Sequence, residues 1–283
     1  MKKGIFSTVI LILVLVVGLS LLLYPTIANW WNSFHATKAI ASYDSIVANM
    51  SDEDYTGLFE DAREYNRQLA QIKYPLMYYD AVGGYYELLN VTGNGIMGYV
   101  DIPRIDVRLP IYHGTSEGVL QIAAGHMQGT SLPTGGESTH CALSAHRGLP
   151  SARLFTDLDE LEKGDTFTLN VIDRVLTYEI DQILIVEPSD VEPLYVEEGK
   201  DYCTLVTCTP YGINSHRMLV RGIRTDNAAD DKAIRVTADA MLVEPVLVAP
   251  VLAAPILLLM LLMLLLPNPK KKKNRKKKRR KKL

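Results

Sequence analysis

Residues 204–222 read TLVTCTPYGINSHRMLVRG, which predicts a strand, a turn and a second strand. The two ends of this stretch are rich in β-branched and apolar residues, whereas Pro210 and Gly212 interrupt the pattern between them. The same texture recurs in GYVDIPRIDVRLPIYH (98–113) and in TFTLNVIDRVLTYEIDQILIVEP (166–188). Short strands at this spacing predict a mainly β domain, either a sandwich or a barrel.

A helical segment is expected before these strands. Ser51 and Asp54 have the spacing of a helix-capping box. Apolar residues at positions 58–72 then recur at helical spacing, up to a break at Pro75. Within the β-rich part, only brief helical pieces fit, such as residues 154–164.

Two uncharged apolar segments, residues 5–24 and 246–266, are long enough to cross a membrane, which takes about 20 residues. The first follows Lys2 and Lys3 and has two interpretations, an uncleaved anchor or a cleaved secretory signal. Its length, and the lack of a clear small-x-small cleavage site after it, favour the anchor. Residues 29–50 are expected to continue this helix or to form a stalk.

Charge sets the topology. The C-terminal segment 270–283 holds 12 lysine and arginine residues, a flank typical of the cytoplasmic side, where it touches anionic lipid rather than nucleic acid. Both ends are therefore expected inside and residues 25–245 outside. Without those 12 residues and Lys2 and Lys3, the outer part keeps 16 of the 30 basic residues and all 32 acidic residues. Its net charge is therefore about −16. Such a charge argues against nucleic acid as a partner. It suits solubility, or the attraction of lysine-bearing partners.

Cys208 is a candidate nucleophile. The chain has three cysteines, so in an oxidising outer compartment at least one has no intramolecular disulfide partner. Cys208 stands where its strand ends, and a hairpin would bring Arg217 back towards it. The planar donors of that guanidinium suit a carbonyl oxygen that becomes negative during acyl transfer. The alternative is a buried thiol beside an arginine in an ordinary β-hairpin.

Six histidines compete for the role of general acid and base. His146, in CALSAHRGLP, repeats the arrangement around Cys208: an apolar run, then the polar residue, then a glycine-proline stop. His216 should point to the face opposite Arg217 if that strand is regular. Spacing favours His146 over the four others (His35, His113, His126 and His140), although a lone histidine is more often structural.

These motifs resemble those of sortases, specifically the pilus-assembling class C type. TLVTCTPYGINSHRMLVRG is similar to the active-site signature of that family, and LPTGGESTHCALSAHRGLP (132–150) resembles the stretch that holds its catalytic histidine. NGIMGYVDIPRIDVRLPIYHGTSEGVL (94–120) and GHMQGTSLP (125–133) also read like its early strands. The resemblance covers about residues 85–225.

The resemblance implies a closed eight-stranded sortase-type β-barrel with short helices, and it assigns three roles. Cys208 matches the nucleophile, His146 the general acid and base, and Arg217 the residue that positions substrate and stabilises the oxyanion. The implied reaction cleaves an LPXTG-like sorting signal between threonine and glycine through a thioacyl enzyme. A lysine of another pilin subunit then forms an isopeptide bond at the surface of a Gram-positive cell. No metal or organic cofactor is implied.

The expected organisation has seven segments: a cytoplasmic N-terminus (1–4), a transmembrane helix (5–24), an extracellular helical stalk and lid-equivalent region (25–84), the catalytic barrel (85–230), a linker (231–245), a second transmembrane helix (246–266) and a basic cytoplasmic tail (267–283).

Two features of the chain need an interpretation beyond the family resemblance. LPTGG at 132–136 looks like a sorting signal but lacks the residue between proline and threonine, so we interpret it as a structural loop. Class C sortases also usually carry an Asp-Pro-aromatic lid, which residues 70–90 lack. Tyr78, Tyr79 and Asp80 would form at most a degenerate lid, with Asp80 reaching Arg217, or the segment is a plain linker. Our hypothesis is that no strongly inhibitory lid exists.

The remaining cysteines, Cys141 and Cys203, each lie five residues before a candidate catalytic residue. If their strands are parallel neighbours, as the family fold implies, the two thiols lie at the same level and face the core. We expect two buried free thiols rather than a disulfide.

Three functions differ only in the acceptor of the acyl group. The leading hypothesis is a pilin-polymerising transpeptidase. The alternatives are a sortase that attaches proteins to cell-wall peptidoglycan and a membrane-tethered thiol hydrolase that uses water. The second apolar segment and the TPYGIN loop favour polymerisation.

Overall fold

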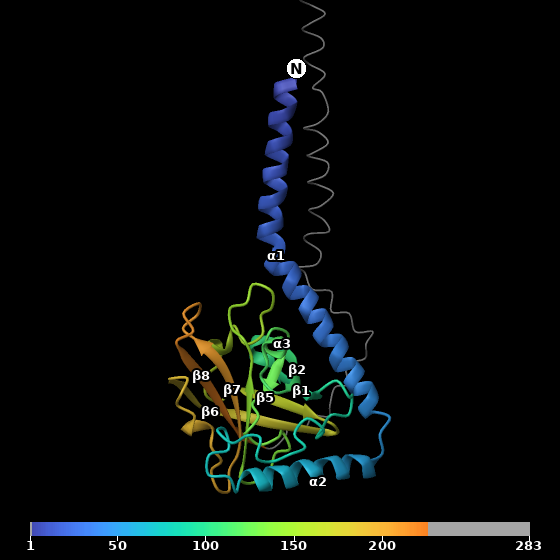
Figure 1. The fold of residues 1–283 in the computed structure, drawn as a ribbon, viewed down its shortest axis with the longest axis vertical. Helices are drawn as coiled ribbons and strands as arrows, with labels where there is room; N and C mark the ends of the chain where they lie inside the picture. Colours follow the sequence, from blue (N-terminus) through green and yellow to red (C-terminus); the bar gives the residue numbers. More distant parts are fainter. Residues whose placement is uncertain (1, 226–283) are drawn as a thin grey trace, which may run out of the picture. The chain divides into compact units, whose positions relative to one another are not determined.

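The computed structural model describes residues 2–225, in which two helices precede a closed β-barrel (Figure 1). The order of the strands around the barrel is β1-β2-β3-β4-β7-β8-β6-β5. Their bounds are β1 Ile96–Ile102, β2 Val107–His113, β3 Ala124–His126, β4 Thr139–Ser144, β5 Thr166–Val171, β6 Arg174–Val186, β7 Asp201–Thr209 and β8 His216–Arg224. The predicted mainly β fold is confirmed, in its barrel form.

Short helical turns connect the strands. They are η1 (Pro103–Ile105), α3 (Glu117–Leu120), η2 (Leu158–Glu160) and η3 (Glu192–Leu194). The helical piece expected at 154–164 is only the three-residue turn η2. The cause is burial, because Leu154, Phe155, Leu158 and Leu161 all enter the core and Leu154 takes a positive φ of 44°. Tertiary packing thus overrides the local helical pattern.

Helix α2 (Asp52–Leu69) begins with the predicted capping box, in which the Ser51 side chain accepts from the Asp54 backbone and the Asp54 carboxylate accepts from the Ser51 backbone. The helix ends at Leu69, earlier than the expected break at Pro75. Asn66 in its last turn is buried and clasps the backbone of Leu132, donating to its carbonyl at 3.2 Å and accepting from its N–H at 2.7 Å. Docking on that loop fixes where the helix stops.

Helix α1 (Lys2–Val47) has 46 residues, which corresponds to about 69 Å at 1.5 Å per residue. Its segment Ile10–Val47 is long and apolar enough to cross a membrane, judged by length and composition. The helix continues past residue 29 and ends at Val47, which fits the first of the two expectations for residues 29–50. The predicted second membrane segment, 246–266, the linker and the basic tail lie outside the described residues.

The second half of α1 is part of the domain core, which the apolar pattern alone did not reveal. Ala36, Ile40, Tyr43 and Val47 are buried and form one stripe at helical spacing. The Tyr43 hydroxyl donates to the Met97 carbonyl at 2.8 Å and accepts from the Ile172 N–H at 2.7 Å, so it ties the helix to β1 and to the β5–β6 turn.

We predict that Tyr43→Phe destabilises the protein by about 1–3 kcal/mol, because it leaves a buried carbonyl and a buried N–H without their partner. The measurement is the free energy of unfolding of the full chain in detergent. Tyr74→Phe is the matched control, because the Tyr74 side chain is exposed. Equal stability of both variants would contradict the bridging role of Tyr43.

Candidate active site

Cys208 and Arg217 face each other across the β7–β8 pair. These strands are antiparallel, and the Cα atoms of the two residues are direct partners in the register. Cys208 is half-buried near the end of β7, and its thiol is free. The hairpin predicted from residues 204–222 therefore brings the guanidinium-bearing residue beside the thiol, as the spacing indicated.

His146 joins this pair from the other side of β7. Strand β4 runs parallel to β7 with Ser144 opposite Val206, and His146 follows two residues beyond Ser144. The extension stays attached, because Ala145 N donates to Val206 O at 3.2 Å and Thr207 Oγ1 donates to Ala145 O at 2.9 Å. Continuing this register places His146 level with Cys208, so the three candidate residues form one row.

Side-chain alternation puts this row on the outer face of the barrel. Cys203 and Leu205 of β7 lie in the main core, whereas Val206 belongs to a second apolar cluster. Cys208 shares the face of Val206, because the two residues are two positions apart. The row Cys208, His146 and Arg217 is therefore reached from outside the barrel wall.

The Arg217 guanidinium is held by its own turn. Its Nη1 donates to the carbonyls of Asn214 at 3.3 Å and His216 at 3.0 Å. An arginine side chain has five N–H donors, so these contacts fix its orientation and leave donors on Nε and Nη2 for a bound carbonyl oxygen.

The other five histidines have structural partners. His35 bonds to Trp31 O, His113 to Gly95 O and Leu88 O, His126 to Tyr85 and Ser131, His140 to Tyr195 and Thr204, and His216 to Ser215. Three of them (His113, His126 and His140) are buried. His146 is the one histidine among residues 2–225 that lies in the row with Cys208.

An acidic partner of His146 was missed by sequence reasoning. The Nε2 atom of His146 lies 3.3 Å from Oε2 and 3.4 Å from Oε1 of Glu117, at the start of α3. The two residues are 29 positions apart, and no local motif connects them. Glu117 stands inside the family-like stretch 94–120, but only the folded barrel brings it to His146.

The buried thiols of Cys141 and Cys203 behave as expected. The two residues are direct partners in the β4–β7 register, both lie in the main core, and both are free. Burial raises the pKa of the Cys203 thiol. These cysteines pack as small apolar residues on the face opposite Cys208 and His146.

The LPTGG stretch is part of the framework, which confirms its interpretation as structure. Residues 131–135 are buried. The Asn66 amide donates to Thr134 Oγ1 at 3.1 Å, and the Gly136 N–H donates to the Asp201 carboxylate at 2.7 Å. A peptide bond held in this way is closed to a nucleophile.

An apolar patch extends along the outer face from the row of Cys208. Ala142, Val206, Leu219 and Leu194 are its buried members, and Leu76, Met127, Leu184 and Val186 pack against them. Leu194 comes from the loop between β6 and β7, whereas Leu76 comes from the chain that follows α2. The patch is therefore sandwiched between the barrel wall and two overlying segments.

In the segment expected as a degenerate lid, a residue other than Tyr78, Tyr79 and Asp80 provides the side chain that packs on this face. Tyr78 and Tyr79 have exposed side chains, and the contact of this stretch is made by Tyr79 O, which accepts from Gln128 at 3.4 Å. Among residues 2–225, no ion pair joins Asp80 to Arg217. Leu76 is instead the side chain that packs on the patch.

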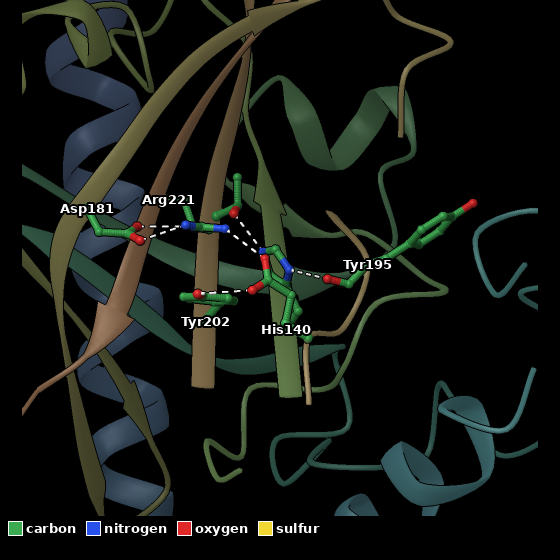
Figure 2. Close-up of polar contacts among 7 residues, drawn as sticks. His140, Asp181, Tyr195, Tyr202 and Arg221 are labelled. Atoms are coloured by element: carbon green, nitrogen blue, oxygen red, sulfur yellow. Dashed lines mark hydrogen bonds and ion pairs between the residues drawn. The ribbon is translucent and has the colours of Figure 1, made fainter. Parts of the chain in front are cut away.

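A polar network fixes the β6–β7 loop over the same face (Figure 2). Arg221 pairs with Asp181 at 2.7 Å and with Glu197 at 3.2 Å, and its guanidinium lies 4.1 Å from the centre of the Tyr202 ring. His140 contacts Tyr195 O at 3.0 Å through Nδ1 and Thr204 Oγ1 at 2.7 Å through Nε2. A carbonyl only accepts, so Nδ1 carries the proton and Nε2 accepts from the threonine hydroxyl.

Burial is the main reason that the pKa of His140 is lowered, and the charge of Arg221 adds to this effect. The Tyr195 carbonyl and the carboxylates of Glu197 and Asp181 oppose it. The neutral ring is therefore the form that holds the loop. Among the described residues, no group of three histidine, cysteine or acidic side chains is arranged to bind a metal ion.

Residues 100–225 match the sortase domain family. The chain is similar to the crystal structure of sortase C1 from Streptococcus agalactiae, with 46% identity and a TM-score of 0.61, over 68% of this chain and 100% of that one. It is also similar to sortase C from Streptococcus pneumoniae, with 45% identity and a TM-score of 0.61, over 68% and 98%.

A third similar structure is sortase C of Clostridium perfringens with the C-terminal cell wall sorting motif, at 42% identity and a TM-score of 0.61, over 68% of this chain and 100% of that one. Among curated proteins, sortase D of Bacillus subtilis is 33% identical over 114 residues, which are 40% of this chain and 54% of that protein. Sortase A of Streptococcus agalactiae is 35% identical over 40% of this chain and 47% of that protein. The chain thus spans about half the length of these two relatives.

We predict that stability falls as the pH is lowered below about 6.5, the usual pKa of histidine. The unfolded chain then binds a proton at His140 that the folded chain, with its lowered pKa, does not bind. The stabilisation is therefore complete above that pH and is lost between it and the folded pKa. The measurement is melting temperature against pH, in which His140→Asn should flatten the fall and the exposed control His35→Asn should not. Equal slopes would contradict the prediction.

Proposed function

The chain belongs to the sortase family of cysteine transpeptidases, and we propose that it assembles pilin subunits into covalent polymers. In this proposal it cleaves an LPXTG-like sorting signal between threonine and glycine and joins the threonine to a lysine amine of another subunit. The observation that carries the proposal is the single row of Cys208, His146 and Arg217 on the outer face. The similarity to sortase C structures supports the choice of class.

The first half of the proposed reaction forms a thioester. The Cys208 thiolate attacks the threonine carbonyl, and the carbonyl oxygen becomes negative. The free donors of Arg217 stabilise this oxyanion from the β8 side. His146 then gives a proton to the departing glycine amine as the C–N bond breaks. The products are a thioacyl group on Cys208 and a neutral imidazole.

The second half transfers the acyl group to an amine. A lysine ammonium loses two protons, one of which is taken up by His146 and the other by solvent. Its nitrogen forms a bond to the thioacyl carbon, and Cys208 leaves as a thiolate. This exchange restores the thiolate and imidazolium with which the cycle began, so one histidine serves as acid and then as base.

The proposal places the barrel at the outer surface of a Gram-positive cell. Support comes from α1, which is long and apolar enough to cross a membrane, and from the charge pattern of the chain ends. The lipid bilayer is then a second partner beside the pilin substrates. Both termini would be cytoplasmic.

Two alternative functions share the same first half-reaction. A sortase that anchors proteins to peptidoglycan would use a different amine, and a membrane-tethered thiol hydrolase would use water. The similarity to structures of sortase C favours pilin as the acceptor over peptidoglycan.

We predict that the full chain in detergent, mixed with a pilin subunit that carries an LPXTG signal, forms a thioacyl adduct and then covalent subunit ladders. Intact mass spectrometry and denaturing gels measure the two products. Cys208→Ala should give neither, and Arg217→Lys should slow adduct formation roughly a hundredfold, since lysine lacks the planar donor pair. An adduct that resolves only to free acid would contradict polymerisation and favour hydrolysis.

We predict that Leu76→Ala lowers the KM for an LPXTG peptide several-fold, because it frees part of the apolar patch that a leucine-bearing signal would use. The alkylation rate of Cys208 should change little, in line with our hypothesis that no strongly inhibitory lid exists. Met77→Ala is the matched control, since Met77 is exposed. A many-fold rise in alkylation after Leu76→Ala, or after deletion of residues 74–84, would mean that the segment covers the thiol.

A further inference from the structure

Glu117 presents an open carboxylate directly beside the candidate general base. Its Oε2 lies 3.3 Å from His146 Nε2, and its side chain is 69% exposed, compared with 26% for His146. Among the ion pairs of residues 2–225, Glu117 pairs only with His146, so no lysine or arginine neutralises it. The proposed roles of Cys208, His146 and Arg217 do not use this charge.

The fold holds this carboxylate in place. Gln121, at the end of α3, donates from Nε2 to Glu117 Oε1 at 2.9 Å. This bond is the main cause, and the contact with His146 the next, of a pKa of Glu117 below its usual value. The carboxyl group is therefore ionised at neutral pH.

Close packing beneath α3 explains why Glu117 reaches the end of β4. A Cβ atom at Gly125 of β3 would lie 2.3 Å from the Gly114 carbonyl oxygen and 3.2 Å from the Val119 side chain. Glycine at this position lets the chain around α3 approach β3, which pairs with β4 at Leu143. The close packing of the chain around α3 on β3 thus brings Glu117 near His146.

The second half-reaction brings a cation to this point, because a lysine, with its ordinary pKa of about 10.4, arrives as an ammonium. An attacking lysine must give a proton to His146, so its nitrogen has to come within about 3 Å of the imidazole. His146 Nε2 can take up this proton when the neutral ring carries its own proton on Nδ1, and a lysine ammonium between Nε2 and the Glu117 carboxylate then donates one N–H to each. A lysine ammonium has three donors, and a hydrogen bond from a cation to a carboxylate is roughly twice as strong as a neutral one.

We propose that Glu117 binds the acceptor amine: its exposed carboxylate receives the incoming lysine ammonium and holds it against His146. This inference rests on the proposed function, because it assigns the acceptor subsite of the same reaction. The lysine ammonium arrives from solvent at the β4 side of Cys208. It passes one proton to His146 and the other to solvent, its nitrogen bonds to the thioacyl carbon, and the C–S bond breaks.

A purely orienting role of Glu117 makes a different prediction. His146 acts in both half-reactions, so a variant that only misplaces the imidazole slows thioacyl formation as well as its resolution. Loss of an amine-binding residue slows resolution by a charged amine selectively. An uncharged nucleophile such as hydroxylamine does not need the carboxylate.

The test uses the full chain in detergent with an LPXTG-bearing pilin as the acyl donor. Thioacyl formation is followed by intact mass, and its resolution is measured with Nα-acetyl-lysine amide and, separately, with hydroxylamine. For Glu117→Gln we expect lysine transfer to fall about tenfold, the loss that one charge-assisted hydrogen bond implies, with a raised KM for the lysine probe. Acylation and hydroxylamine resolution should change by less than about twofold.

Glu117→Asp, which keeps the charge, should recover part of the lysine transfer. Glu137→Gln is the matched control, because Glu137 is an exposed glutamate in the loop before β4, at the strand end away from His146. Equal slowing of acylation and of both resolution reactions in Glu117→Gln would overturn the inference in favour of an orienting role, and unchanged lysine transfer would overturn it outright. A wild-type chain that forms no thioacyl adduct would overturn the proposed function and the inference with it.

Discussion

The site depends on the parallel pairing of β4 with β7. Parallel strands are joined by a long crossover, and here the 56 residues 145–200 lie between the end of β4 and the start of β7. Their register puts Cys141 opposite Cys203 and Ser144 opposite Val206, which brings His146 level with Cys208. A slip of one residue would turn Cys208 into the core and Cys203 outwards, because side chains alternate between the two faces of a strand. The buried cysteines and the candidate catalytic residues are therefore fixed by the same register.

That alternation divides the wall of the barrel into two kinds of environment. Inward residues such as Leu205 and Val220 pack in the main core, whereas the outward residues Val206 and Leu219 form the smaller apolar patch. Further along the same face, Arg221 holds the β6–β7 loop through Asp181 and Glu197. Along the outer face, the row of candidate catalytic residues is thus followed by the apolar patch and then by the ion pairs of Arg221. The loop that covers the patch is attached at the end away from Cys208.

Features that depend on local pattern were predictable from the sequence, and features that depend on distant contacts were not. The hairpin that pairs Cys208 with Arg217 follows from strand periodicity and a turn, and His146 followed from a similar pattern at the end of another strand. In contrast, the sequence does not distinguish Tyr43 from the other residues of a long apolar helix. Its docking on the barrel is recognised only from its hydrogen bonds to Met97 and Ile172. The end of α2 likewise depends on the bond from Asn66 to a loop 66 residues away. Glu117 is a third case, because only the packing of α3 on β3 places it.

The charges around Cys208 are arranged by sign, and this arrangement bears on how water and an amine would be distinguished. Arg217 lies on the β8 side of the thiol, and Glu117, through His146, lies on the β4 side. A bound carbonyl oxygen is drawn towards the cation on one side, and an ammonium towards the carboxylate on the other. Water carries no net charge and gains little from the carboxylate, whereas a lysine is concentrated beside the base that must deprotonate it. An exposed carboxylate therefore favours aminolysis over hydrolysis by raising the local amine concentration, even without a pocket that excludes water.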